Sequence, residues 1–299
     1  MKYPTFKRLI RLAGAVSAVL MLGRYGALAA ETSVSELAGR THFHGIAVDR
    51  ADPGRLYLAT HHGVFIVDLN GGAVRISANR NDYMGFTPHP TDPDVLFGSG
   101  HPVGGGNMGF IRSLDKGKTW EKLSNGINGP VDFHQMDVSK ADPAVIAGIS
   151  HGFQKSRDGG RTWKMIAAAP GGLIDLAASA KDVNTFYGAT RRGLVRSVDG
   201  GRSWKPAHLV RRAVTMVHVV ADGTVYAFQL GTGLIRTTEP KLNWRVVNSD
   251  FGNAYILHLG VHPDNAKQLY AITGNQQSHV QAIMSSPDGG KTWRQLGGK

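Results

Sequence analysis

The chain has 299 residues, no cysteine and a formal net charge of +12 at pH 7. The lack of cysteine excludes a disulfide framework and a lipoprotein anchor. The charge does not indicate nucleic-acid binding, because the Lys and Arg residues are scattered through expected turns and form no stripe interleaved with aromatic residues.

The first thirty residues differ in composition from the remainder. Four basic residues precede an apolar run (12–22), and Ala27-Leu28-Ala29 follows as a small-x-small cleavage site. This order is typical of a secretory signal peptide. We therefore predict removal of residues 1–30, a single domain over 31–299, and export to the periplasm or out of the cell. A membrane anchor is the alternative, but the run is short for a span and Arg24 interrupts its far side. No other segment is predicted to cross a membrane.

The rest of the chain consists of short apolar strands that alternate with polar turns. In each unit a first strand leads into an Asp-Pro or related turn, a second strand returns, and a third and a fourth strand follow. First strands are predicted at 44–48, 84–88, 134–138, 174–178, 214–220 and 257–261. Second strands are predicted at 56–60, 95–99, 145–150, 185–190, 224–229 and 268–273, and third strands at 63–67, 109–113, 153–156, 193–197, 233–237 and 281–285. Six units of four strands, with no helical period, predict an all-β, six-bladed β-propeller. Residues 33–40 are expected to supply a strand that closes the ring against the last unit.

An octapeptide that ends in tryptophan follows the third strand of most units. Its copies are SLDKGKTW (113–120), SRDGGRTW (156–163), SVDGGRSW (197–204) and SPDGGKTW (286–293), with a degenerate copy that ends at Trp244. A period of about 40 residues indicates a repeat architecture. The Asp is expected to bond the backbone of a turn, the Gly residues to adopt positive φ, and the Trp to pack beneath the next strand. We predict structural roles for Asp115, Asp158, Asp199, Asp288, Trp120, Trp163, Trp204 and Trp293.

The octapeptide resembles the Asp-box, or BNR, repeat of sialidases, sortilin-type receptors and photosystem II assembly factors. This resemblance implies a hairpin on the outside of a propeller blade, and it identifies no function. The first unit lacks the motif and has VDLNGG (67–72) in its place. The chain also resembles exported bacterial Asp-box proteins labelled glycosyl-hydrolase-like, through His-Gly at 44–45, His-His-Gly at 61–63 and Gly-His-Pro at 100–102.

Histidines recur at two equivalent positions in the first three units. Counted from the Asp of each Asp-Pro turn, the residue eight before it and the residue nine after it are His44 and His61, Met84 and His101, and His134 and His151. The start of a first strand and the turn between the second and third strands lie at the same end of a blade. We therefore expect these six residues at one mouth of the central channel, opposite the octapeptides.

The first unit allows a finer prediction from its hairpin register. If strands 44–48 and 56–60 pair symmetrically, His42 faces His62, and His44 is diagonal to His62. His42, His44 and His62 then form a cluster of three imidazoles, with His61, His101, His134 and His151 as possible neighbours.

Such a cluster predicts a transition-metal site. Imidazole suits Cu, Zn, Ni and Fe, and Met84, Met108 and Met136 would add thioether ligands for Cu(I). Copper is therefore the preferred ion and zinc the alternative. Two other interpretations stay open: the histidines are inherited structural residues, or this mouth binds a small polar ligand, a glycan or a protein.

The sequence does not favour an enzyme. The chain has glutamates only at 31, 36, 121 and 239, none at the start of a first strand, so the Tyr-Glu pair of a sialidase is not indicated. Asp132 and Asp175 are weak catalytic candidates for glycoside hydrolysis, which needs two carboxylates about 5–9 Å apart. They could instead accept backbone bonds or complete a metal shell. Arg191, Arg192 and Arg211 are candidates for binding an anion. We predict a non-enzymatic binding protein; the alternatives are a glycosidase or glycan-binding protein and a scaffold for a membrane-protein partner.

Overall fold

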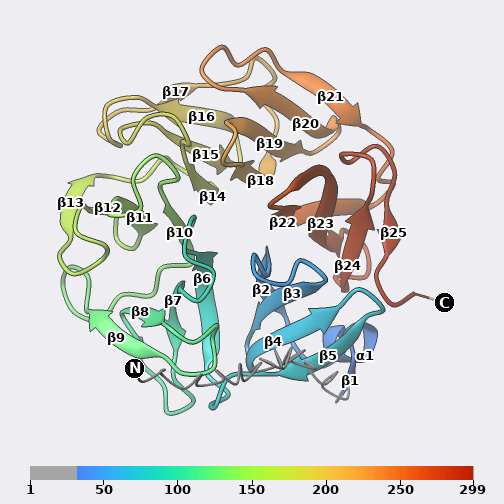
Figure 1. The fold of residues 1–299 in the computed structure, drawn as a ribbon. Coiled ribbons are helices and arrows are strands. Elements are labelled where there is room, and N and C mark those ends of the chain that lie inside the picture. Colours follow the sequence, from blue (N-terminus) through green and yellow to red (C-terminus); the bar gives the residue numbers. More distant parts are fainter. Residues whose placement is uncertain (1–31, 299) are drawn as a thin grey trace, which may run out of the picture.

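The computed structural model describes residues 32–298, which form six antiparallel sheets around a central channel (Figure 1). The proposed signal peptide lies outside the described residues. Five sheets have four strands, ordered from the channel outward along the chain, and the first sheet has a fifth strand, β1, on its outer edge. The prediction of a six-bladed β-propeller is confirmed. Among the described elements there is one short helix, and none is long and apolar enough to cross a membrane.

The blades follow one another around the ring in sequence order. Blade one comprises β2 (Phe43–Val48), β3 (Arg55–Thr60), β4 (Gly63–Asp68) and β5 (Gly72–Arg75). Blade two comprises β6 (Asp82–Pro88), β7 (Leu96–His101), β8 (Phe110–Ser113) and β9 (Glu121–Ser124). Blade three comprises β10 (Gln135–Val138), β11 (Ile146–Ile149), β12 (Phe153–Ser156) and β13 (Lys164–Ala167).

The second half of the ring repeats this plan. Blade four comprises β14 (Leu173–Ala178), β15 (Phe186–Thr190), β16 (Gly193–Ser197) and β17 (Lys205–Pro206). Blade five comprises β18 (Val214–Val219), β19 (Thr224–Gln229), β20 (Gly233–Thr238) and β21 (Arg245–Asn248). Blade six comprises β22 (Ala254–His262), β23 (Asn265–Asn275), β24 (Gln281–Ser286) and β25 (Arg294–Gln295). The predicted strand positions agree with these bounds, except that the β22–β23 hairpin is longer than expected.

The predicted closing strand at 33–40 is wrong. Thr32–Ser33 (β1) pairs with β5 on the outer edge of blade one, and Val34–Ala38 forms the helix α1. The reason is local, because Ser33 and Glu36 make a capping box that favours a helix start. Val34 and Leu37 of α1 pack in the apolar cluster that joins blades one and six. We call the contact between neighbouring blades a seam. At the seam of blades one and six, the Phe43 amide donates to Gln281 Oε1 at 2.7 Å, and Gln281 Nε2 donates to the Phe43 carbonyl at 3.2 Å.

The octapeptides form turns at the rim opposite the histidines, and each packs against the preceding blade. In blade three the Thr162 amide and hydroxyl donate to the Asp158 carboxylate at 2.9 and 2.6 Å. These bonds lower the pKa of Asp158 to about 2. Gly160 has φ +88°, and a Cβ there would lie 2.0 Å from the Phe110 ring of blade two. Trp163 Nε1 donates to Ser124 Oγ, also in blade two, at 2.9 Å. Equivalent carboxylate bonds occur at Asp115, Asp199 and Asp288.

The first strands of all six blades line a cavity of about 240 Å³ in the channel. Each is an edge strand, so its backbone groups on the channel side need partners other than a neighbouring strand. Side chains of the previous blade supply some of them. Asp137 accepts from the Ala178 amide at 2.8 Å, Asp175 accepts from the Val217 amide at 2.9 Å, and Thr215 Oγ1 donates to the Ile256 carbonyl at 2.6 Å. Polar side chains in this layer thus join the blades.

Candidate metal centres

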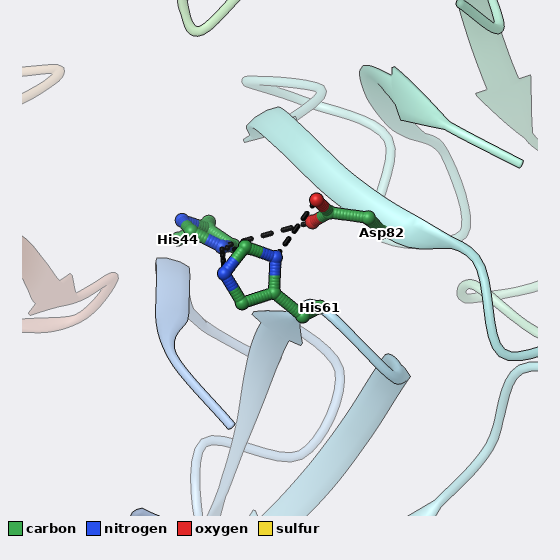
Figure 2. Close-up of side chains that lie close together, drawn as sticks. All are labelled: His44, His61 and Asp82. Carbon is green, nitrogen blue, oxygen red and sulfur yellow. Dashed lines mark hydrogen bonds and ion pairs between the residues drawn. The ribbon is translucent and has the colours of Figure 1, made fainter. Parts of the chain in front are cut away.

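The seam between blades one and two holds a triad of two imidazoles and a carboxylate (Figure 2). His44 lies in β2, His61 follows β3, and Asp82 is the first residue of β6. His61 Nδ1 is 2.8 Å from Asp82 Oδ2, and His44 Nε2 is 3.6 Å from Asp82 Oδ1. His44 Nε2 also lies 3.2 Å from His61 Nδ1. One ligand atom from each residue lies within 4.8 Å of the others. We name this group the first triad.

The seam between blades two and three holds a second triad of the same composition. His101 ends β7, whereas Asp132 and His134 precede β10. His101 Nε2 is 3.0 Å from Asp132 Oδ2, and His134 Nε2 contacts the same oxygen. The two imidazole rings have centroids 6.4 Å apart and meet nearly edge to face. This arrangement again brings three ligand atoms within 4.8 Å of one another.

The two triads share one device of the repeat. In each, the histidine of the turn between the second and third strands of one blade contacts an Asp at the start of the next blade: His61 contacts Asp82, and His101 contacts Asp132. The third ligand differs. The first triad uses His44 of the earlier blade, and the second uses His134 of the later blade, because Met84 stands at the intervening position. The aspartates lie two residues before Met84 and His134, and this shared offset was the signal in the sequence that could have identified Asp82.

The predicted cluster of His42, His44 and His62 does not form. The register of residues 45–48 is as expected, since Gly45 pairs with Ala59 and Val48 with Leu56. A β-bulge at His44 then shifts the register, and Phe43 pairs with Thr60. His61 therefore lies beside His44, while His62 is exposed and donates its backbone amide to Thr60 Oγ1 at 2.9 Å. His42 stays next to the first triad, with its ring centroid 5.4 Å from that of His61.

His151 is placed at the same rim but joins neither triad. It is exposed, has φ 56°, and its Nδ1 lies 3.2 Å from Ser150 Oγ. The next blade has Gly172 where the earlier blades have Asp82 and Asp132, so the equivalent position offers this histidine no carboxylate. The His-Asp contact between neighbouring blades therefore recurs at two seams, those of blades one and two and of blades two and three.

In each triad, one buried carboxylate oxygen has no hydrogen-bond partner. Asp82 Oδ1 and Asp132 Oδ1 are buried and accept no hydrogen bond, and they are the only carboxylate oxygens in that condition among residues 32–298. Burial, together with the nearby imidazoles of His61 and His258, lowers the pKa of His44 to about 3. His44 is therefore neutral at pH 7 and offers a nitrogen lone pair. The hydrogen bond to Asp132 raises the pKa of His134.

The three methionines considered as ligands are core residues. Met108 packs with Ala59 and Tyr83, and its sulfur accepts from Asn81 Nδ2 at 3.4 Å. Met136 packs with Phe133, and Met84 is buried. The described ligand atoms of the triads are thus imidazole nitrogens and carboxylate oxygens.

The two aspartates considered as a catalytic pair are bound to different partners. Asp132 holds the histidines of the second triad. Asp175 lies in β14, where its oxygens accept from the amides of Leu176 and Val217 at 2.9 Å. Burial raises the pKa of Asp175 to about 7. This bonding suits a structural role for Asp175. Arg191, Arg192 and Arg211 are exposed on rim loops of blades four and five.

The fold defines the class of this chain as a six-bladed β-propeller. No protein-family model matches it, and no curated protein matches its sequence. Similar solved structures include a GH74 xyloglucanase from Xanthomonas campestris, with a TM-score of 0.57 and 21% identity over 88% of this chain and 46% of that chain. A GH74 enzyme from Niastella koreensis has a TM-score of 0.57 and 18% identity over 90% and 46%. YCF48 from Cyanidioschyzon merolae has a TM-score of 0.53 and 19% identity over 87% and 86%.

At these identities the comparisons show the fold alone. This chain spans less than half the length of the two GH74 enzymes. Nearly the whole of the YCF48 chain is covered, so the similarity there is between two chains of comparable extent.

Proposed function

We propose that this chain is an exported, non-enzymatic Asp-box propeller that binds divalent transition-metal ions at the two triads. The observation that carries the proposal is the buried, unpartnered carboxylate oxygen of Asp82 and of Asp132. A buried acceptor without a partner costs about 1–3 kcal/mol, and more when it is charged. A cation held by that oxygen and the two imidazoles would remove this penalty in both triads.

The donor set indicates which ions suit the site. Two imidazoles and one carboxylate suit Cu²⁺, Zn²⁺, Ni²⁺ or Fe²⁺, and they leave open coordination positions. Among divalent ions copper forms the most stable complexes, so we propose Cu²⁺ as the tightest ligand and Zn²⁺ as the alternative. The burial of Met108 and Met136 in apolar clusters gives no support to a thioether site for Cu(I).

The test is metal binding by the exported protein and its variants. We expect two ions per chain by isothermal titration with Cu²⁺ and with Zn²⁺, and one ion in Asp82→Asn or Asp132→Asn. The double variant should bind more than about 100-fold more weakly, since changes even outside the ligand set lower affinity 10–100-fold. His62→Ala is the matched control, because this exposed histidine lies outside both triads. Equal binding by wild type and the double Asp variant would overturn the proposal.

A scaffold role is the second candidate. The similarity to YCF48 covers 86% of that chain, whereas the similarity to the GH74 xyloglucanase covers only 46% of the enzyme, so we favour a scaffold over a hydrolase. The separate engagement of Asp132 and Asp175 gives no support to a glycosidase pair. Crosslinking of the exported protein in its native membrane fraction tests this candidate. It requires one stoichiometric protein partner that survives stringent washing, and recovery of the chain alone would refute it.

A further inference from the structure

The loop between β17 and β18 presents an apolar tip to solvent. Leu209 is 96% exposed and the neighbouring Val210 is 39% exposed. An exposed apolar residue by itself is ordinary on a protein surface. The way this loop is held and the charges around it distinguish it from other exposed apolar residues.

The loop is fixed on both sides of the tip. Trp244 Nε1 donates to the Ala207 carbonyl at 2.8 Å. The buried Gln229 donates through Nε2 to the carbonyls of Val210 and Arg212, at 2.9 and 3.3 Å. Blade five thus anchors the loop before and after Leu209. Little conformational entropy remains to be lost when the tip binds something, which favours a preorganised contact.

Four exposed arginines surround this tip. Arg211 and Arg212 follow it directly, and Arg191 and Arg192 form the adjacent turn of blade four. The turn and the loop are neighbours, because a Cβ on Gly193 would lie 3.5 Å from the Val210 carbonyl and 3.7 Å from Arg211 Cα. Within residues 32–298 none of the four guanidinium groups has a carboxylate at ion-pair distance; the ion pairs that occur are elsewhere. We name Leu209, Val210 and these arginines the basic tip.

Charge is unevenly divided between the two rims. The basic tip lies at the rim of the triads, where the loops between blades begin. Among the described residues, the carboxylates near this rim are those of Asp82 and Asp132, both engaged with histidines, of Asp175, which accepts backbone amides, and of Asp250. The octapeptides and the Asp-Pro turns place most of the other carboxylates at the opposite rim. The four arginines of the basic tip therefore lie at a rim with few carboxylates to neutralise them.

We propose that the basic tip docks this rim onto a bilayer that contains anionic phospholipids. Leu209 would enter the headgroup region, and the arginines would bind lipid phosphates. Arginine suits this role because its planar fork binds phosphate oxygens in pairs. An anionic surface attracts each basic residue strongly enough to raise binding about five-fold. This proposal does not depend on metal binding, and it would place both triads close to the membrane surface.

The test is sedimentation of the exported protein with vesicles of phosphatidylcholine alone or with 30% phosphatidylglycerol. Neutral vesicles report any binding by an apolar N-terminal segment that remains on the chain. We expect wild type to bind the anionic vesicles, and the fourfold variant Arg191→Gln/Arg192→Gln/Arg211→Gln/Arg212→Gln to bind at least 100-fold more weakly. Leu209→Asp should weaken binding at least ten-fold. Both changes are at exposed positions, so unchanged thermal unfolding is expected as well.

Matched controls are available at the opposite rim. Leu114 is 55% exposed in an octapeptide, and Arg161 and Arg202 are octapeptide arginines. Leu114→Asp and the double variant Arg161→Gln/Arg202→Gln should leave binding unchanged within two-fold. Equal loss in the controls, undiminished binding by the fourfold variant, or no preference of wild type for anionic vesicles would each overturn the proposal. The last result would point instead to an acidic protein as the partner.

Discussion

Two sets of seams in the same ring use carboxylates in opposite ways. At the seams of blades one to three, Asp82 and Asp132 each keep a buried oxygen without a partner. At the seams between blades three, four and five, Asp137 and Asp175 accept backbone amides of the next blade. Asp137 and Asp175 join neighbouring blades by accepting backbone amides. Each triad carboxylate is held by a histidine but keeps one oxygen that accepts no hydrogen bond. Burial alone does not separate the two kinds, but the inventory of hydrogen-bond partners does.

Removal of a scaffold carboxylate should have the largest effect on stability. Asp137 accepts from Thr87 Oγ1, from the Ala178 amide and from Lys140 Nζ, so it joins blades two, three and four. Asp137→Ala leaves the lysine without its partner in a largely buried site and should lower the free energy of unfolding by about 3–5 kcal/mol. Urea unfolding measures this loss. Asp137→Ala/Lys140→Met should recover part of this loss. If Asp137→Ala alone is as stable as wild type, Asp137 is not a scaffold residue and the contrast with the triad carboxylates fails.

The next effect is a pH dependence that arises from Asp175. Its pKa is raised to about 7 in the fold, above the value of 3.8 for the free side chain. Between these values the folded chain holds a proton that the unfolded chain releases, so this group makes stability fall as pH rises from about 4 to about 7. Asp175→Asn should flatten that part of the stability curve, by up to about 4 kcal/mol overall. An unchanged slope in the variant would show that Asp175 is ionised in the fold.

His44 should give the opposite slope. Its pKa is lowered to about 3 from 6.5, so below pH 6.5 the unfolded chain binds a proton that the fold excludes. Stability from this group is therefore present above pH 6.5 and is lost as pH falls toward 3. His44→Gln should reduce the acid destabilisation, and saturating Zn²⁺ on wild type should oppose it between pH 5 and 6.5. Thermal unfolding across that range, with and without the ion, measures both effects.

The smallest effect is expected at the triad carboxylates of the metal-free protein. Asp82→Asn removes the unpartnered oxygen of a charged group but also the bond to His61, and the two changes oppose each other. We expect the free energy of unfolding to change by less than about 1 kcal/mol. A loss comparable to that of Asp137→Ala would instead make Asp82 a scaffold residue, and urea unfolding under the same conditions decides between them.

The sequence predicted the repeating parts of the molecule well. Alternating strands and the spacing of the tryptophans placed six blades, and the offsets of His44, His61, His101 and His134 placed them at one rim. Two predictions were wrong, the cluster of His42, His44 and His62 and the closing strand at 33–40, and each depended on a local feature of one or two residues. The bulge at His44 replaced His62 by His61 in the first triad, and a bulge depends on how the edge strand bends into the channel. At α1, Ser33 and Glu36 form a capping box, and this local pattern outweighs the strand expected at 33–40.

The joint between the first and last blades has a further consequence. Within residues 32–298, every blade is made of one continuous stretch of chain, and no strand from one end joins the sheet at the other end. The Val34 amide bonds the Gly71 carbonyl, and Gly71 lies against Gly297, so the two described ends are neighbours. A circular permutant that opens at the 249–253 loop and links these ends should therefore fold to the same ring. We expect each blade to form from its own stretch of chain during synthesis. The ring would close only after blade six, residues 254–295, has been made.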